Sequence, residues 1–263
     1  MLITERGSTC KITIITVVFN GSREIEKTLK SIFAQSYVNK EVIVIDGGST
    51  DGTLGIISNY KQYIDYFITE QDSGIYDAMN KGIRVADGEW ICFMNIGDIF
   101  YSNDIISNIF SSGEIREDII VGDCIVDFEL FKRHVNTKSL SLIDYGMTFC
   151  HQSAFVKTKL YRQRYFNLKY TIAADFDFFY WCYISGVNFI THNSPFSIVT
   201  AGGLSDSMRV QVLAENRDIV RKYSQLSLKK ELIYSMNIFW TRLKILVIKI
   251  LPYSLVLFLK KIK

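Results

Sequence analysis

The chain has 263 residues, of which 48% are hydrophobic, 14% are aromatic and only two are proline, so its composition excludes a disordered or low-complexity protein. Its net charge of +3 is unevenly spread, because eight basic residues and one acidic residue follow residue 225 while the preceding residues are net negative. This distribution excludes a basic nucleic-acid-binding body. It indicates an anionic partner for the tail, either a membrane or a nucleic acid.

The first hundred residues alternate between β-rich apolar runs and helical periods. Residues 12–19 predict a strand buried on both faces, and the Asn20-Gly21-Ser22 turn leads into a helix that Ser22 is placed to cap. The alternation continues through predicted strands and helices in chain order: a strand at 41–46, a helix at 53–64, a strand at 65–69, a helix at 75–87 and a strand at 89–95. This order is typical of βαβ units and of an α/β fold with a Rossmann-like, mostly parallel sheet flanked by helices.

The pattern after residue 115 is mixed. In chain order we expect strands near 118–134, a helix after His151, a helix through 174–185, short strands near 187–200 and a helix over 208–223. These elements are expected to complete the sheet. The apolar run at 12–19 leads into Asn20-Gly21 and not into a cleavage site for export, so we expect a cytoplasmic protein.

A polar, glycine-rich turn follows each predicted parallel strand, where ligands of such sheets bind. The first is VIDGGSTDGT at 44–53, in which the Asp46 carboxylate is placed to contact the base or ribose of a nucleotide. The alternative is a plain turn in which Asp51 caps the next helix. The turn lacks the GxGxxG spacing of a dinucleotide-binding loop, which disfavours an oxidoreductase.

A second cluster lies in EQDSGIYDAMNKGI at 70–83. Its polar members recur at spacings that allow several to line one side of a helix, and they are Asp72, Tyr76, Asp77, Asn80 and Lys81. These side chains either line a ligand-binding crevice or form an ordinary solvent-exposed face of the helix. A third cluster, FMNIGDIF at 93–100, delivers Asp98 to the end of a strand, which suits a divalent cation bridging two phosphates or else a simple turn.

Together these motifs resemble glycosyltransferase family 2, the inverting enzymes of the GT-A fold, over about residues 11–223. The run DSGIYDAMNKGI followed by NIGDIF resembles the subgroup that builds bacterial exopolysaccharides and O-antigens, including the colanic acid enzymes. The resemblance implies a nucleotide-sugar donor and Mn²⁺ or Mg²⁺ held by Asp98. It implies donor contacts from Thr16, Asn20, Asp46, Asp72, Tyr76, Asn80, Asn95 and Asp98. The first acid of the family's DxD-type motif is absent here, where Asn95 stands.

Two later segments also match the family. CHQSAF at 150–155 resembles its acceptor-side segment, which implies that His151 and Gln152 bind the acceptor, although a lone histidine is often structural. YTIAADFDFFYW at 170–181 places Asp175 at the position of the catalytic base. Asp177 is its nearest competitor, but two residues round a helix it faces elsewhere.

The resemblance implies that residues 1–225 form a GT-A domain. Residues of about 11–115 are expected to form its nucleotide-sugar-binding half, and residues of about 116–225 its acceptor-side half. The expected reaction is inverting transfer of a hexose, with UDP as the expected carrier, to a lipid-diphosphate-linked sugar such as an undecaprenyl diphosphate derivative. The expected location is peripheral, on the inner face of the bacterial cytoplasmic membrane, with no nucleic-acid partner. The alternative is a catalytically silent nucleotide-sugar-binding partner of a membrane polysaccharide assembly.

The tail, 226–263, predicts a basic amphipathic helix. Its longest apolar stretch, 245–259, is interrupted by Lys249 and Pro252 and is shorter than the roughly 20 residues that a spanning helix needs. Aromatic residues and lysines suit the boundary of an anionic membrane, where each basic residue contributes about 1 kcal/mol. We therefore expect a peripheral helix lying in the interface. The alternative is a helix packed on the domain with a solvated basic face.

Overall fold

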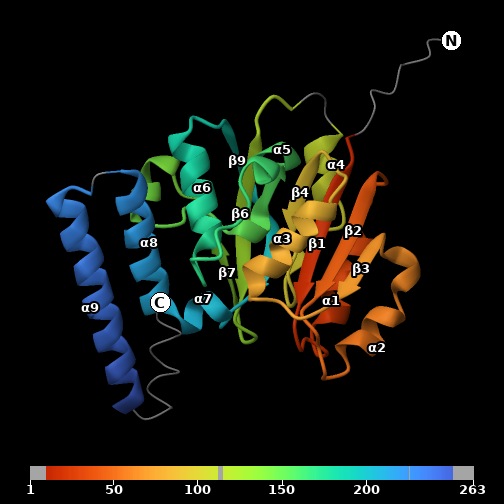
Figure 1. The fold of residues 1–263 in the computed structure, drawn as a ribbon, viewed down its shortest axis with the longest axis horizontal. Helices are drawn as coiled ribbons and strands as arrows, with labels where there is room; N and C mark the ends of the chain where they lie inside the picture. Colours follow the sequence, from red (N-terminus) through yellow and green to blue (C-terminus); the bar gives the residue numbers. More distant parts are fainter. Residues whose placement is uncertain (1–9, 112–114, 225, 251–263) are drawn as a thin grey trace.

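A single mixed sheet forms the centre of the molecule (Figure 1). The computed structural model describes residues 10–111, 115–224 and 226–250. The strands in these ranges are β1 (Ile12–Val18), β2 (Lys40–Asp46), β3 (Tyr66–Thr69), β4 (Trp90–Phe93), β5 (Ile99–Phe100), β6 (Ile119–Asp127), β7 (Lys132–Val135), β8 (Ala154–Lys157) and β9 (Phe189–Thr200).

The strand order is β3-β2-β1-β4-β8-β6-β9-β5, with β7 paired to β6. The pairs β1–β2, β2–β3, β1–β4 and β6–β9 are parallel, and the other pairs are antiparallel. Because β8 inserts in the opposite direction between β4 and β6, both of those strands run the same way as β1. The predicted α/β fold with a mostly parallel sheet is confirmed.

The helices cover both faces of the sheet. They are α1 (Ile25–Phe33), α2 (Thr53–Ser58), α3 (Ile75–Val85), α4 (Ile105–Phe110), α5 (Thr158–Gln163), α6 (Ala174–Ile184), α7 (Leu204–Ser207), α8 (Arg209–Tyr223) and α9 (Leu228–Ile250). Three 3₁₀ turns in the described ranges are η1 (Lys61–Tyr63), η2 (Leu140–Tyr145) and η3 (His151–Ser153).

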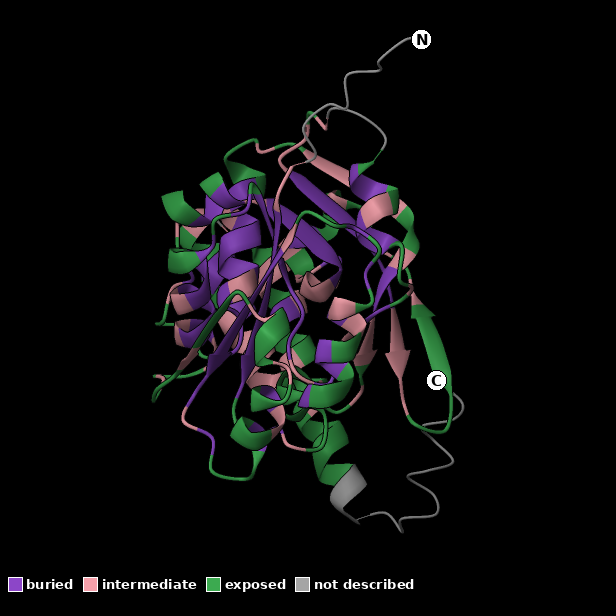
Figure 2. Ribbon diagram, turned by 90° about the vertical axis from the view of Figure 1, so that its right-hand side faces the viewer, coloured by how far each residue is buried: buried purple, intermediate pink, exposed green. Residues whose placement is uncertain are grey.

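Two hydrophobic clusters pack against the sheet, one on each face. Side chains alternate along β1, so Ile12 and Ile14 join α1, α2 and α4 on one face while Ile15 and Val17 join α3, α5, α6 and α8 on the other. The strands β1 and β4 are accordingly buried along their whole length, and β2 is buried from Glu41 to Asp46 (Figure 2). Burial of each large aliphatic side chain stabilises the fold by about 1.5–3 kcal/mol, which holds the strand ends in fixed positions.

Three local expectations are corrected. Ser22 does not cap α1, because the helix begins at Ile25 with Glu24 at its N-cap position, and no side chain caps it. The backbone N–H of Ser22 donates to Asp51 Oδ2 at 3.0 Å. The helix expected after His151 starts only at Thr158, since η3 and β8 intervene. Residues 189–200 form one strand with a bulge and not several short ones. Both later errors arise because a short apolar run buried between neighbours has no distinctive period.

The helix α9 packs beside α8 at one end of the molecule (Figure 1). Tyr234 anchors it, with only 1% of its surface exposed, and Glu231 pairs with Arg221. Among the described residues no helix combines the length and the hydropathy that crossing a membrane requires. The part of the predicted tail at 251–263 lies outside the described residues.

Candidate functional site

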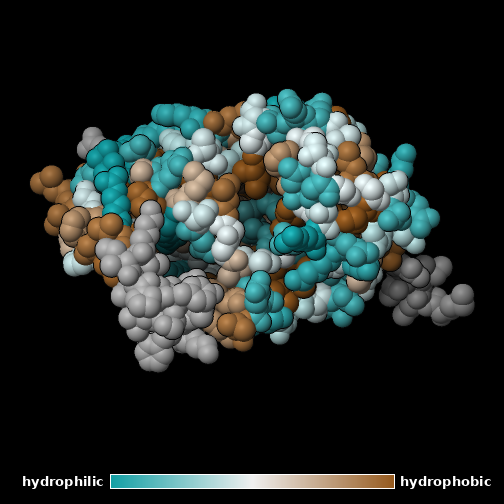
Figure 3. Space-filling model, turned by 90° about the horizontal axis from the view of Figure 1, so that it is seen from below, coloured by the Kyte–Doolittle hydropathy of each residue, from teal (hydrophilic) through white to brown (hydrophobic). Residues whose placement is uncertain are grey.

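The carboxyl ends of β1, β2, β4, β6 and β9 lie along one edge of the sheet, the lower edge in Figure 1. Seen from below, the surface is hollowed near its middle (Figure 3). Open α/β sheets bind ligands in the crevice beyond this edge. The predicted site residues that follow these strands therefore share one side of the molecule.

Two glycine-rich turns meet after β2 and β3. Asp46 is fully buried, and its Oδ2 accepts hydrogen bonds from the backbone N–H groups of Gly48 and Ser49 at 3.0 and 2.9 Å and from a threonine hydroxyl of β3. A Cβ atom on Gly47 would lie 2.9 Å from Asp72 Oδ2, so glycine lets the second turn approach the first. Asp46 thus holds its own turn in shape beside Asp72.

Asn20 joins the loop after β1 to the turn after β2. Its backbone N–H donates to Ser49 Oγ at 2.8 Å, and its Oδ1 accepts from the backbone N–H of Thr50 at 2.9 Å. Its φ of 49° is uncommon outside glycine but is tolerated by asparagine. Thr16 lies deeper, fully buried in β1, where its hydroxyl donates to the carbonyl of Met94 at 2.9 Å.

The loop after β4 carries Asn95 and Asp98, which are both buried. Asp98 Oδ2 accepts a hydrogen bond from Gln152 Nε2 at 2.9 Å, and its Oδ1 accepts one from the backbone N–H of Thr200 at 3.3 Å. Burial raises the pKa of Asp98 to about 6, although these hydrogen bonds oppose the shift. Asn95 Oδ1 is buried without a hydrogen-bond partner among the described residues.

The 3₁₀ turn η3 places two adjacent side chains between two carboxylates. Gln152 donates to Asp98, whereas His151 Nδ1 lies 3.2 Å from Asp175 Oδ2. The other ring nitrogen of His151, Nε2, lies 3.5 Å from Asn95 Nδ2. Asp98 and Asp175, which come from separate segments of the chain, therefore lie on either side of one short turn.

Asp175 lies in the first turn of α6 and is held by several donors. Its Oδ1 accepts the Tyr76 hydroxyl at 2.9 Å and the backbone N–H of Phe176 at 2.8 Å. Burial alone would raise the pKa of Asp175, but the contacts with His151 and Tyr76 outweigh burial and leave it below its ordinary value. Asp177 lies apart from this cluster, in a 2.6 Å ion pair with Arg164.

Comparison with known proteins identifies the family. Residues 13–187 match the family model described as Glycosyl transferase family 2. The chain belongs to glycosyltransferase family 2. It is therefore a glycosyltransferase, and the resemblance seen in its motifs is confirmed at the level of the family.

Curated relatives of this glycosyltransferase include mycobacterial proteins. A "PGL/p-HBAD biosynthesis glycosyltransferase" of Mycobacterium bovis (strain BCG / Pasteur 1173P2) is 29% identical over 204 residues, which cover 74% of this chain and 79% of the relative. An uncharacterized glycosyltransferase of Mycobacterium tuberculosis (strain CDC 1551 / Oshkosh) is 30% identical over 174 residues, 64% of this chain and 66% of the relative. The finer likeness to colanic acid enzymes stays a prediction.

Solved structures share the fold. Residues 1–349 of S. aureus TarS align with a TM-score of 0.64 at 18% identity, covering 85% of this chain and 69% of that one. The mannosyltransferase PcManGT from Pyrobaculum calidifontis, solved with GDP-Man and Mn²⁺, aligns with a TM-score of 0.60 at 16% identity, covering 87% and 79%. The GT-A-like arrangement of sheet and helices in this glycosyltransferase follows from these alignments.

The predicted polar face of α3 is divided between two roles. Tyr76 reaches Asp175, whereas Asn80 is 2% exposed and exchanges two 2.9 Å hydrogen bonds with the backbone of Phe166. Lys81 pairs with Asp72 at 2.5 Å and with a second acid at the end of β3. Only part of this face therefore contributes side chains to the cluster around Asp175.

Two contributors were missed by sequence reasoning. Thr200, the last residue of β9, donates its backbone N–H to Asp98. A sequence pattern cannot predict this contact, because any residue other than proline has the same backbone donor. Glu215 on α8 accepts hydrogen bonds from the backbone N–H groups of Ile172 and Ala173 at 3.1 and 3.0 Å, just before α6. Glu215 thereby fixes the start of the helix that carries Asp175.

The residues present fit a divalent cation that also binds phosphate. Among the described residues no three His, Cys, Asp or Glu side chains gather as a complete metal site. Mg²⁺, however, is commonly bound by one or two carboxylates together with substrate phosphates, and Asp98 provides one such carboxylate. A cation would also favour the ionised form of this buried group. The unpartnered oxygen of Asn95 is of the chemical type that hard cations prefer.

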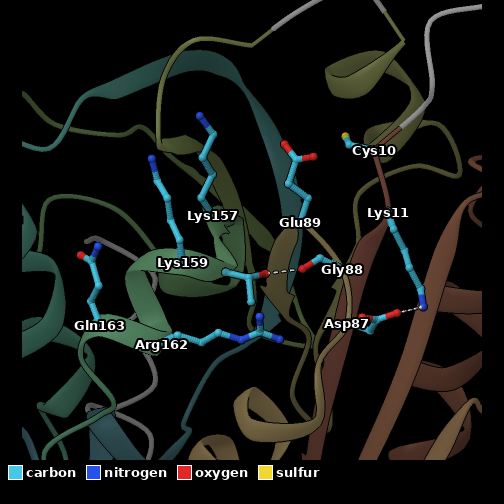
Figure 4. Close-up of a pocket in the computed structure, with 10 residues that line it drawn as sticks. Cys10, Lys11, Asp87, Gly88, Glu89, Lys157, Lys159, Arg162 and Gln163 are labelled. Carbon is cyan, nitrogen blue, oxygen red and sulfur yellow. Dashed lines mark hydrogen bonds and ion pairs between the residues drawn. The ribbon is translucent and has the colours of Figure 1, made fainter.

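A second hollow of about 930 Å³ lies at the opposite, amino ends of the strands (Figure 4). Its lining includes side chains of both charges. Lys11 pairs with Asp87 of the same lining at 3.2 Å, whereas Lys157 and Lys159 pair with Asp118, which does not line the hollow. It contains none of the predicted site residues.

Proposed function

We propose that this glycosyltransferase transfers a hexose from a UDP-sugar to a lipid-diphosphate-linked saccharide, with inversion, at the inner face of the bacterial cytoplasmic membrane. The observation that carries the proposal is the cluster in which η3 contacts both Asp98 and Asp175. Direct displacement requires donor and acceptor to meet in one cleft, with a diphosphate-facing group and a base on either side of the reacting carbon.

Asp175 is the base in this proposal. The acceptor oxygen forms its bond to the anomeric carbon as the bond to the diphosphate breaks on the opposite face, and the hydroxyl proton passes to Asp175. A lowered pKa keeps this carboxylate ionised at neutral pH, and the contacts with Tyr76 and His151 fix its direction. His151 and Gln152 line the acceptor side, and no covalent intermediate is needed.

Asp98 faces the donor diphosphate in this proposal. Mn²⁺ or Mg²⁺ held by Asp98 would neutralise charge on the departing nucleotide diphosphate. The structure of PcManGT contains Mn²⁺ with GDP-Man, and TarS has been solved with UDP and with UDP-GlcNAc, which supports a nucleotide-sugar donor. The other proposed donor contacts are Thr16, Asn20, Asp46, Asp72, Tyr76, Asn80 and Asn95.

The basic tail supports a membrane-held acceptor. The exposed surface of α9 includes Leu232, Phe239 and Trp240 together with Arg242. Aromatic, aliphatic and basic side chains in one helix suit the boundary of an anionic bilayer. A lipid-linked saccharide is an acceptor that such a surface would keep within reach of the cleft.

One observation favours the second candidate, a catalytically silent nucleotide-sugar-binding partner. Asn95 stands where the family has the first acid of its DxD-type motif, so the described cleft offers one carboxylate at that loop. A silent protein would bind the donor without releasing nucleotide when an acceptor is added. The two candidates therefore differ in turnover and not in donor binding.

The test is release of nucleotide diphosphate from a panel of UDP-, GDP- and dTDP-sugars by the purified full chain, with Mn²⁺ and a lipid-diphosphate-linked saccharide. We expect release with UDP-hexose, and with Asp175→Asn we expect about 10²- to 10⁴-fold less, the usual contribution of a general base. Asp87→Asn is the matched control, because Asp87 is exposed at the opposite end of the sheet. Release by Asp175→Asn at the rate of the control would refute the mechanism.

A further inference from the structure

Two cysteines from separate segments lie side by side near the candidate site. Cys124 is in β6 and Cys150 immediately precedes η3, and their side chains are in hydrogen-bonding contact. Both are free thiols in this structure. The proposed reaction uses neither of them, although adjacent thiols can be joined by a disulfide when their backbones lie close enough.

The hydrogen bonds around this pair hold the two backbones together. Ser153 Oγ, at the end of η3, donates to the carbonyl of Asp123, the residue before Cys124, at 2.7 Å. The same hydroxyl lies 2.7 Å from the Oγ of Ser197, the β9 residue that pairs with Cys124. The backbone N–H of Ser153 donates to the carbonyl of Cys150 at 2.9 Å. The turn that carries Cys150 is therefore fixed to β6 and β9 beside Cys124.

Cys150 also connects the pair to Asp98. Its thiol donates to Gln152 Oε1 at 2.8 Å, and Gln152 Nε2 donates to Asp98 Oδ2 at 2.9 Å. A glutamine side chain has one acceptor end and one donor end, so the bond from the thiol fixes which end faces the carboxylate. A chemical change at the sulfur of Cys150 therefore reaches Asp98 through a single side chain.

We infer that Cys124 and Cys150 form a site of oxidative modification, at which hydrogen peroxide produces a disulfide that releases Gln152 from Asp98. A disulfide has no S–H group, so Gln152 Oε1 loses its donor and Nε2 is no longer directed at the carboxylate. Oxidation then weakens donor binding, and this last step rests on the proposed function, in which Asp98 faces the donor diphosphate.

The chemistry balances with one peroxide molecule as the oxidant. One sulfur attacks the peroxide, so that an S–O bond forms as the O–O bond breaks, and the thiol proton leaves with the second oxygen as water. The other sulfur then attacks the resulting sulfenic acid, so that the S–S bond forms as the S–O bond breaks. The remaining thiol proton leaves in a second water molecule. Cys150 is partly exposed, which suits access by an oxidant this small.

The first experiment treats the reduced full chain with hydrogen peroxide and maps its disulfides by mass spectrometry. We expect Cys124 to be joined to Cys150, and dithiothreitol to restore both thiols. Cys10→Ala is the matched control and should form the same disulfide, because Cys10 is also partly exposed but lines the hollow at the opposite end of the sheet (Figure 4). Recovery of Cys124 and Cys150 as thiols, or as sulfinic acids without a disulfide, would overturn the site.

The second experiment follows the side-chain amide of Gln152 by NMR in a chain labelled with ¹⁵N-glutamine, with the signal assigned from Gln152→Ala. We expect the signal to move when the disulfide forms and to return with dithiothreitol. An unmoved signal in the oxidised chain would overturn the link to Asp98. Neither this measurement nor the disulfide map depends on the reaction that the protein catalyses.

Titration with UDP in the presence of Mn²⁺ then tests the effect on donor binding. We expect about tenfold weaker binding by the oxidised chain, the equivalent of one hydrogen bond to a charged group. If oxidation leaves UDP affinity unchanged while Asp98→Ala weakens it, the effect of the disulfide on donor binding is overturned. If Asp98→Ala also binds UDP normally, the proposed role of Asp98 is what fails.

Discussion

At the scale of single residues, the hydrogen bonds that Asp98 accepts offset only part of the cost of burying its carboxylate. Its pKa in the folded protein is about 6, against an ordinary value of 3.8. The folded state therefore holds the Asp98 proton more tightly than the unfolded state does. This contribution to stability is fully present below about pH 4 and is lost as the pH rises through about 6.

We therefore expect Asp98→Asn to unfold at a higher temperature than the unaltered chain at pH 7, with donor and cation absent. The gain in free energy of unfolding should be roughly 2 kcal/mol larger at pH 7 than at pH 4, because the variant has no carboxylate to desolvate. Chemical denaturation across this pH range measures the difference. A gain in free energy of unfolding that does not depend on pH would show that burial does not raise the pKa of Asp98.

At the scale of elements, α8 positions the base on α6. Glu215 accepts hydrogen bonds from the backbone N–H groups of three successive residues, 171–173, which lead directly into α6 and end two residues before Asp175. Glu215 therefore fixes the path of the chain into the helix that carries Asp175.

We expect Glu215→Ala to lower turnover more than donor binding, and to destabilise the fold by about 1–3 kcal/mol through unsatisfied N–H groups. Asp218→Ala, at a more exposed position on the same helix, is the control. Steady-state kinetics with a donor titration separate the two effects. Equal turnover in both variants would show that Asp175 keeps its place without Glu215.

The sequence predicted elements best where each strand is flanked by helices, as from β1 to β4, because continuous apolar runs and glycine turns alternate there. It failed at β8, four residues whose place between β4 and β6 depends on tertiary pairing. The same reason applies to the site. Asp98, His151 and Asp175 were predicted from motifs. The backbone contact of Thr200 with Asp98, and the contacts of Glu215 with the residues before α6, depend on the tertiary fold.

At the scale of the whole molecule, α9 divides into a packed half and a projecting half. A chain that ends at residue 235 keeps Tyr234 in the core and the pair between Glu231 and Arg221. We expect this truncation to move the protein from the membrane fraction to the supernatant after cell lysis, with little change in thermal unfolding. Sedimentation with membranes that is the same with and without 236–263 would contradict a membrane-binding tail.

The most direct test of the whole account is paired measurement of UDP binding and sugar turnover in two variants of the full chain, with Mn²⁺ present. Placement of Asp98 at the diphosphate and Asp175 at the acceptor predicts that Asp98→Ala weakens UDP binding in calorimetry. The same placement predicts that Asp175→Asn binds UDP with nearly unchanged affinity but transfers sugar at least about 10²-fold more slowly than the unaltered chain. Unaltered UDP binding by Asp98→Ala, or near-normal turnover by Asp175→Asn, would contradict it.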